Sequence, residues 1–150
     1  MIGQLKPSEM EALLAAEATG RIGCHAEGKT YVVPVTYVYR DGFIFCHTGE
    51  GMKVAMMRQN PSVCFEVDHT EDLRRWKSVI IQGKFSELHG EEASKAMTYL
   101  STRLFPDGIP KAPEAEGLFP ELDRAVLDGR RGLVFKIRVT EMTGRFERHP

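Results

Sequence analysis

The sequence has few cysteines, almost no net charge and no apolar run long enough to span a bilayer. Its three cysteines, Cys24, Cys46 and Cys64, are an odd number without a closely spaced pair, which predicts free thiols in a cytoplasmic protein. The first residues acquire charge early and lack the apolar core of a signal peptide. A formal net charge of −1 excludes general attraction to nucleic acid or to an anionic membrane. Any anion site must therefore be local.

Common catalytic motifs are missing as well. No Gly-x-Ser-x-Gly elbow occurs, and the three cysteines lie in apolar segments where thiols are usually inert, so no hydrolase nucleophile is evident. The chain lacks the Gly-Lys-Ser/Thr ending of a P-loop and the dinucleotide fingerprint. Without an internal repeat or a linker, the 150 residues predict a single domain, 1–150.

Apolar segments separated by turn residues predict a mainly β protein with peripheral helices. Close strand spacing favours an antiparallel barrel, and Gly83 is expected to mark a bulge or bend. We expect a helix after Pro7, with a capping box at Ser8–Glu11, and a helix beginning near Lys53 that Asn60-Pro61 ends. Strands are predicted at 21–26, 31–39, 43–48, 62–69, 76–88 and 133–143, further helices at 91–104 and 120–127, and a loop at 106–118.

The loop between the third predicted strand and the second predicted helix contains Gly49, Glu50 and Gly51, followed by Met52 and Lys53. Backbone N–H groups at a helix N-terminus can hold an anion, and a lysine there adds a positive charge. The loop is therefore a candidate phosphate site, although a glycine-rich loop with one lysine is more often only a loop.

A Cys-His dipeptide occurs twice, at Cys24-His25 and Cys46-His47, and His69 follows at a similar interval. Adjacent strand residues point to opposite faces, so neither pair can chelate one metal. Three histidines from three strands could still meet, but no acidic or second cysteine ligand is placed to help. We predict no metal site.

The fifth predicted strand begins with the only tryptophan, and Trp76 and Ser78 share one of its faces. A tryptophan in this position is most often a core or interface anchor, but it can also wall in a planar ligand. Ser78 could donate a hydrogen bond to a phosphate. The same strand, through Trp76, Val79 and Ile81, could cover apolar surface of a second chain.

Five segments, in this order and spacing, resemble FMN-binding split-barrel proteins related to pyridoxamine 5′-phosphate oxidase, and among them most the branch of nitroimidazole-resistance proteins. The segments are VPVTYVY, FIFCHTGEGMK, RQNPSVCFEVD, WKSVIIQGK and EMTGRFE. The resemblance implies a six-stranded antiparallel split β-barrel that forms a homodimer. It also implies FMN in two equivalent sites at the dimer interface, each built from both chains.

The resemblance also assigns roles to individual positions. The cofactor-binding residues that it implies are Pro34, Val35, Thr36 and Tyr37 along the flavin ring, Cys46 and His47 where a strand meets the flavin, Met52 and Lys53 at the phosphate, and Ser78 on the phosphate side. Trp76 is a further candidate on its own chemistry, as a wall of the ligand site.

Two departures from the oxidase matter. The oxidase has an arginine at the position of Met52, so one phosphate cation is missing here. The C-terminal segment 145–148 is also a poor match to the arginine-rich segment that grips the oxidase's substrate, which argues against pyridoxamine phosphate oxidation. His47 matches a strand histidine that lies near the flavin in the nitroimidazole-resistance branch. It is either a catalytic proton donor or a hydrogen-bonded strand histidine.

We therefore expect an FMN-dependent oxidoreductase that passes electrons to a small organic acceptor, with His47 as the catalytic residue. A second hypothesis is a non-catalytic flavin or haem protein for storage or sensing, with His25, His47 or His69 as iron ligand. A third is a cofactor-free interaction module.

Overall fold

The computed structural model describes residues 1–108 and 132–149. Seven strands and three helices occupy these residues. The strands are β1 (Ile2–Gln4), β2 (Thr19–Ala26), β3 (Lys29–Arg40), β4 (Phe43–Thr48), β5 (Ser62–Asp72), β6 (Arg75–Leu88) and β7 (Leu133–Arg148). The helices are α1 (Pro7–Ala16), α2 (Met52–Gln59) and α3 (Gly90–Leu104).

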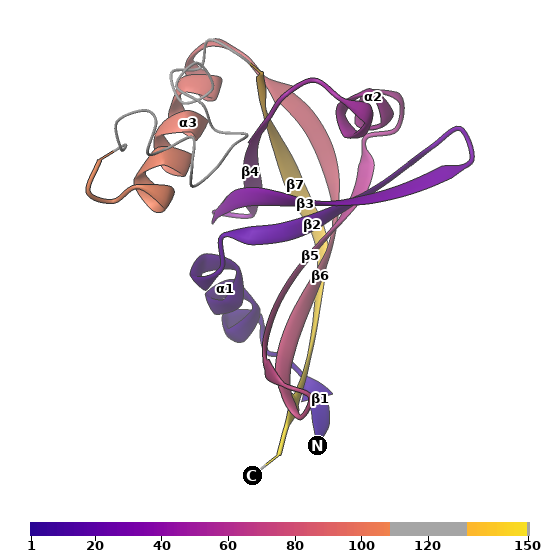
Figure 1. Cartoon of the computed structure of the whole chain (residues 1–150), viewed down its shortest axis with the longest axis vertical. Coiled ribbons are helices and arrows are strands. Elements are labelled where there is room, and N and C mark those ends of the chain that lie inside the picture. The colour runs from indigo at the N-terminus through magenta and orange to yellow at the C-terminus, as the bar shows by residue number, and fades with distance from the viewer. Residues whose placement is uncertain (109–131, 150) are drawn as a thin grey trace.

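The strands form one antiparallel sheet in the order β1-β7-β4-β3-β2-β5-β6, and an additional pairing of β6 with β7 closes it into a barrel. Strands β5, β6 and β7 extend well below the barrel, where both termini lie (Figure 1). Helices α2 and α3 lie at the upper end, and α1 lies beside the middle of the sheet. The predicted mainly β split barrel is confirmed, with seven strands rather than six.

The additional strand is β1, whose three residues pair with the end of β7. A segment this short carries no readable alternation, so only its distant partner identifies it as a strand. The predicted helix at 120–127 and most of the predicted loop at 106–118 lie outside the described residues.

Alternation along β6 produces the core. Val79, Ile81, Gly83 and Phe85 take the inward positions and are buried, whereas Ile80, Gln82 and Lys84 face outward. The predicted irregularity at Gly83 is confirmed, because the β6–β7 register shifts between Gln82 and Gly83. A side chain at this glycine would lie 2.4 Å from Ile137 Cγ2 and 2.8 Å from the Arg138 carbonyl oxygen, so the two strands approach too closely for any other residue.

Helix α1 buries Met10, Leu13 and Leu14 against the barrel. Its N-cap is Lys6, whose backbone N–H donates to Glu9 Oε1 at 2.9 Å. The prediction of a capping box at Ser8–Glu11 was therefore wrong by two residues, because Pro7 already occupies the first helical turn.

No helix in the part of the chain that the structure describes is long and apolar enough to cross a membrane.

Candidate functional site

Helix α2 lies against the upper end of the barrel. Its apolar side buries Val54, Met56 and Met57, and Met56 Sδ lies 4.0 Å from Cys24 Sγ of β2. These contacts hold the helix and leave its first turn, with Lys53, at the rim. Asn60 ends the helix, as predicted: its backbone N–H bonds to the Met56 carbonyl in an extended conformation.

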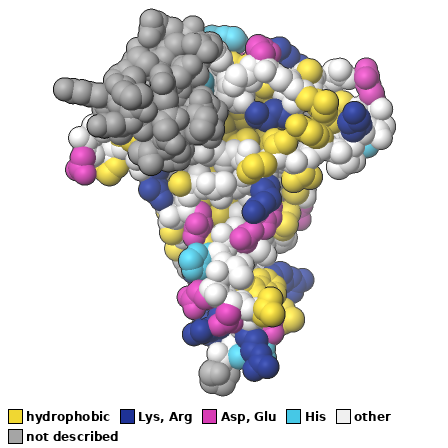
Figure 2. Space-filling view, in the orientation of Figure 1, with side chains coloured by type: hydrophobic (Ala, Val, Ile, Leu, Met, Phe, Trp, Pro, Cys, Tyr) yellow, Lys and Arg dark blue, Asp and Glu magenta, His cyan; other side chains and the backbone are white. Residues whose placement is uncertain are grey.

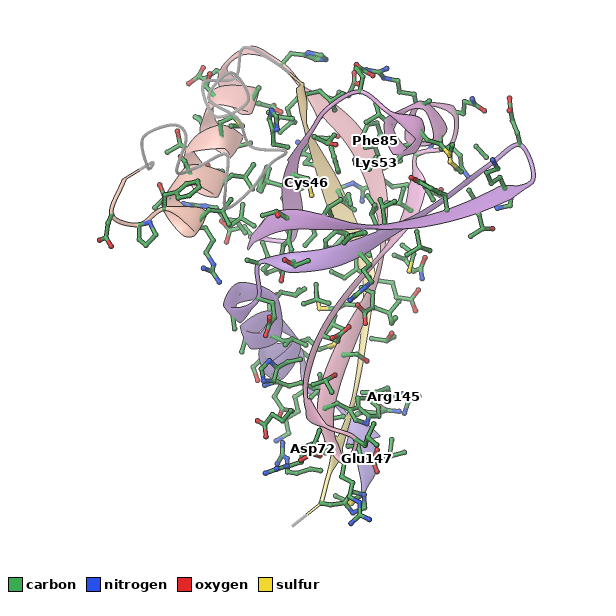
Figure 3. All side chains as sticks on the ribbon, viewed as in Figure 1. Cys46, Lys53, Asp72, Phe85, Arg145 and Glu147 are labelled. Carbon is green, nitrogen blue, oxygen red and sulfur yellow. The ribbon has the colours of Figure 1, made fainter. Side chains whose placement is uncertain are left out.

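The ammonium of Lys53 lies close enough to the barrel end to act on two buried thiols. Burial raises the pKa of the thiols of Cys24 and Cys46, and the positive charge of Lys53 opposes that rise in both. Figure 3 shows Lys53 and Cys46 together in the upper part of the molecule. Lys53 thus lies in the upper part of the molecule, on the helix that packs on Cys24.

The first turn of α2 has no acidic residue, and the helix has no side-chain cap. Within 1–108 and 132–149, no carboxylate lies within ion-pair distance of Lys53. The nearby acidic residue of the loop, Glu50, is engaged elsewhere: Arg58 Nη2 and Nη1 donate to its carboxylate at 2.9 Å and 3.1 Å, and Arg58 Nε donates to Glu87 at 2.7 Å. Lys53 and the unbonded N–H groups of the first turn thus remain available for an anion.

The four β3 residues that are predicted to contact the flavin ring, 34–37, alternate between the two faces of the strand. Tyr37 is fully buried; its hydroxyl donates to the Leu14 carbonyl at 2.7 Å. Val35 also packs on the barrel core. Pro34 is exposed and Thr36 is half-buried on the opposite face. Only these two can offer side chains to a surface-bound ligand, and the other two can offer backbone groups alone.

The adjacent strand β4 divides in the same way. Cys46 pairs with Tyr37 and is fully buried in the barrel. Cys46 can therefore offer a flavin only its backbone, and its contact with the cofactor stays a prediction. His47 points to the opposite face, as predicted, and by alternation this is the face that also carries Thr36.

The surroundings of His47 include a glycine that sequence reasoning missed. Gly132 has φ +83°, and a Cβ there would lie 2.9 Å from His47 Cε1 and 2.5 Å from the Thr48 carbonyl oxygen. Only glycine suits both the backbone conformation and this close approach. The position of Gly132, directly before an apolar predicted strand, was the feature of the sequence that could have identified it. Further along the same face, Phe45 packs edge-to-face on Tyr99 of α3 with ring centroids 5.4 Å apart.

The remaining predicted residues separate into an upper and a lower group. Met52 is exposed beside Lys53 on α2. Ser78, in contrast, pairs with Asp68 and with Arg145, and Arg145 lies in the lower part of the molecule (Figure 3). Within one chain, Ser78 is therefore not brought to Lys53.

Trp76 lies still lower and is engaged. Its Nε1–H donates to Glu147 Oε2 at 2.9 Å, and the same carboxylate bonds to His149 at 2.7 Å. This favours the anchor interpretation over the predicted wall of a ligand site.

The histidines do not gather into a ligand set. His25 Nδ1 lies 3.1 Å from the Thr30 hydroxyl, and His69 Nδ1 lies 3.0 Å from Glu17 Oε1. Among the described residues, no three His, Cys, Asp or Glu side chains are arranged to hold a metal ion.

A groove of about 510 Å³ crosses the outward side of strands β3, β2, β5 and β6, and its walls are mostly apolar. It includes Gly23, Val32, Cys64 and Gln82. We call this surface the outer face. Sequence reasoning expected Val79 and Ile81 to cover a second chain, which is wrong because both are buried in the barrel. Figure 2 shows hydrophobic side chains gathered over the arm of β2 and β3, with basic side chains among them.

An antiparallel sheet in this strand order, closed by the pairing of β6 with β7 and accompanied by few helices, is the fold of a split-barrel protein. The chain belongs to the pyridoxamine 5′-phosphate oxidase family, whose model matches residues 6–146. It is 28% identical to an uncharacterized protein of Rhizobium meliloti over 91% of this chain and 89% of the relative.

Solved structures agree with this assignment. A FAD-binding protein from Mesorhizobium loti superimposes with a TM-score of 0.76 at 26% identity, covering 97% of this chain and 98% of that one. A candidate 5-nitroimidazole antibiotic resistance protein from Bacteroides thetaiotaomicron gives a TM-score of 0.78 at 22% identity, covering 97% and 87%. The first of these proteins is named for its binding of FAD, and the second likeness supports the fold alone.

Proposed function

We propose that this protein is an FMN-binding oxidoreductase that passes electrons to a small organic acceptor. The observation that carries the proposal is Lys53, a cation without a carboxylate partner in the described structure, at the start of a helix that has no acidic residue in its first turn. A terminal phosphate fits this donor set of one ammonium and several N–H groups. Membership of a flavin-binding family supports the same conclusion.

The chain's own residues divide the work. Lys53 and the first turn of α2 hold the phosphate, while Pro34 and Thr36 border the ring with side chains and Tyr37 with its backbone. When bound, FMN supplies reversible electron transfer. His47 holds a proton at a ring nitrogen and delivers it to the acceptor as the acceptor is reduced, a role to which an imidazole side chain is suited.

The proposal includes a homodimer that pairs through the outer face. Among the residues that the structure describes, no helix residue lines this face. Val32 is 60% exposed, and Ile80, which takes the outward position between Val79 and Ile81, is 38% exposed. Pairing would bury this apolar surface. It would also allow Ser78 of one chain to serve the Lys53 site of the other, which a single chain does not allow.

The test begins with the absorption spectrum of the purified protein and the mass of its released ligand. Apo-protein is then titrated with FMN, FAD and riboflavin. FMN should bind most tightly, because only FMN ends in a phosphate that the start of α2 can hold. Equal affinity for riboflavin and FMN would refute the phosphate assignment. Tighter binding of FAD would place this chain with its FAD-binding neighbour from Mesorhizobium loti.

A flavin-loaded protein that reduces no acceptor would leave the non-catalytic flavin binder as the function. A haem spectrum would contradict both the FMN oxidoreductase and the non-catalytic flavin binder, and would identify a haem protein.

A further inference from the structure

One guanidinium lies between two carboxylates on the outer face. Arg21 of β2 is paired in register with Glu66 of β5, and its Nη1 lies 3.4 Å from Glu66 Oε1 and 3.1 Å from Asp68 Oδ2. The two acids are two residues apart on one strand and therefore share a face. When both are ionised, the cluster carries a net charge of −1.

Neighbouring groups do not compensate this charge. On β3 the register neighbour of Arg21 is Pro34, and on β6 the partners of Glu66 and Asp68 are Ile80 and Ser78, all without charge. Other titratable groups on this face are His25 of β2, which is bonded to Thr30, Lys84 of β6, which is bonded to Ser62, and Glu141 and Arg145 of β7, which lie across β6 from the cluster.

Of the two acids, Glu66 is the one that takes up a proton near neutral pH. Its side chain is only 27% exposed, compared with 36% for Asp68. Burial raises the pKa of Glu66 to about 7, and hydrogen bonding to Asp68 and its charge add to the rise, which Arg21 opposes. A proton on Glu66 makes the cluster neutral and leaves Arg21 paired with Asp68.

We propose that this cluster makes the pairing of two copies through the outer face dependent on pH, with tighter pairing when Glu66 is protonated. The inference rests on the dimer in the proposed function. In a two-fold pairing, each Arg21 arrives with its own Glu66 and Asp68, so two ionised clusters bring together two net negative charges.

The sign of the effect follows from linkage. Removal of water by the second copy raises the pKa of Glu66 further, so association takes up protons. Pairing is therefore strongest below about pH 7, where Glu66 is protonated in both states, and weakens as the pH rises above that value.

The experiment is sedimentation equilibrium of the purified protein at about pH 6 and about pH 8.5 at constant ionic strength. The dissociation constant of the wild-type dimer should rise by about tenfold or more between these values, because two symmetric sites each release a proton. The Glu66→Gln variant should form a tight dimer at both pH values. Glu141→Gln is the matched control: this exposed β7 residue pairs with Gln82 on the same face but lies outside the cluster, so the pH dependence should persist.

Asp68→Asn provides a second variant if Glu66→Gln does not fold. Removal of the neighbouring charge should move the pH dependence to lower pH. A wild-type dimer that pairs equally at both pH values, or more tightly at the higher one, would overturn the inference and leave the proposed dimer intact. A monomer at both values would overturn the dimer itself, and the pH dependence with it.

Discussion

The upper and lower ends of the molecule differ in whether certain charged side chains have a partner within the chain. At the lower end, Arg75 Nη2 lies 2.6 Å from Asp72, and Glu147 accepts from both Trp76 and His149. At the upper end, Lys53 has no such partner in the described residues, although Glu50 is only three residues away in sequence. These charged groups of the lower end are thus paired within the chain, whereas Lys53 at the upper end retains an uncompensated charge at a helix start.

This difference separates structural from functional use of the same residue types. A cation whose partners lie within the chain contributes to the fold, and at an exposed position it contributes little. A cation without a partner, at a site where backbone N–H groups are also open, is typical of an anion-binding site. Both ends contain residues that the resemblance assigned to the flavin: Lys53 lies at the upper end, whereas Ser78 pairs with Arg145 in the lower part.

The largest expected effect concerns His47. If it donates a proton, His47→Ala should retain FMN and slow flavin reoxidation by an electron-poor acceptor, such as a nitroheterocycle, by about 10²–10⁴-fold. The measurement is single-turnover reoxidation after reduction with dithionite, together with FMN affinity. His25→Ala, which removes a strand histidine bonded to Thr30, is the control and should reoxidise normally.

Joint loss of thermal stability and flavin occupancy in His47→Ala would instead identify a structural histidine. Unchanged affinity with unchanged reoxidation would remove His47 from the mechanism.

The second effect concerns Lys53. Lys53→Ala should weaken FMN binding by about 1.5–3 kcal/mol, the usual contribution of a hydrogen bond to a charged group. The matched variant is Lys29→Ala at the exposed start of β3, which should bind FMN as the wild type does. Fluorescence titration of the apo-proteins measures both. If the two variants bind FMN alike, Lys53 is only a surface lysine and the contrast between the two ends disappears.

The smallest effect is at the lower end. Trp76→Phe removes the indole N–H that donates to Glu147 and keeps an aromatic ring. We expect the unfolding midpoint to fall by about 2–4 °C, with FMN affinity unchanged. Thermal unfolding and the same titration test this. A loss of FMN affinity at constant stability would show that Trp76 of one copy does border the flavin of the other.

Local patterns predicted most elements well because their causes are local. The strand from Phe43 to Thr48 has the predicted bounds, since turn residues precede it and a glycine-rich loop follows it. Helix α2 likewise ends where Asn60-Pro61 must end it. The capping position of α1 was misplaced because several polar residues in succession could each serve, and only backbone geometry selects Lys6.

The candidate site was only partly predictable for a related reason. Alternation indicated that Cys46 and His47 face opposite sides of their strand. It could not indicate that Gly132, 85 positions after His47, would pack against the histidine ring. Nor could it bring Arg21 between Glu66 and Asp68, because strand register over this separation depends on the whole sheet.

The sequence by itself determined the elements, their apolar and polar sides, and the position of Lys53 at the start of α2, because these depend on neighbours within a few residues. Only the tertiary structure decided which side of each strand became the barrel interior, since that depends on the closure of β6 on β7. The same closure buried Tyr37 and Cys46 and left the outer face open. The free energy of burial is shared by all seven strands, so no single segment contains that information.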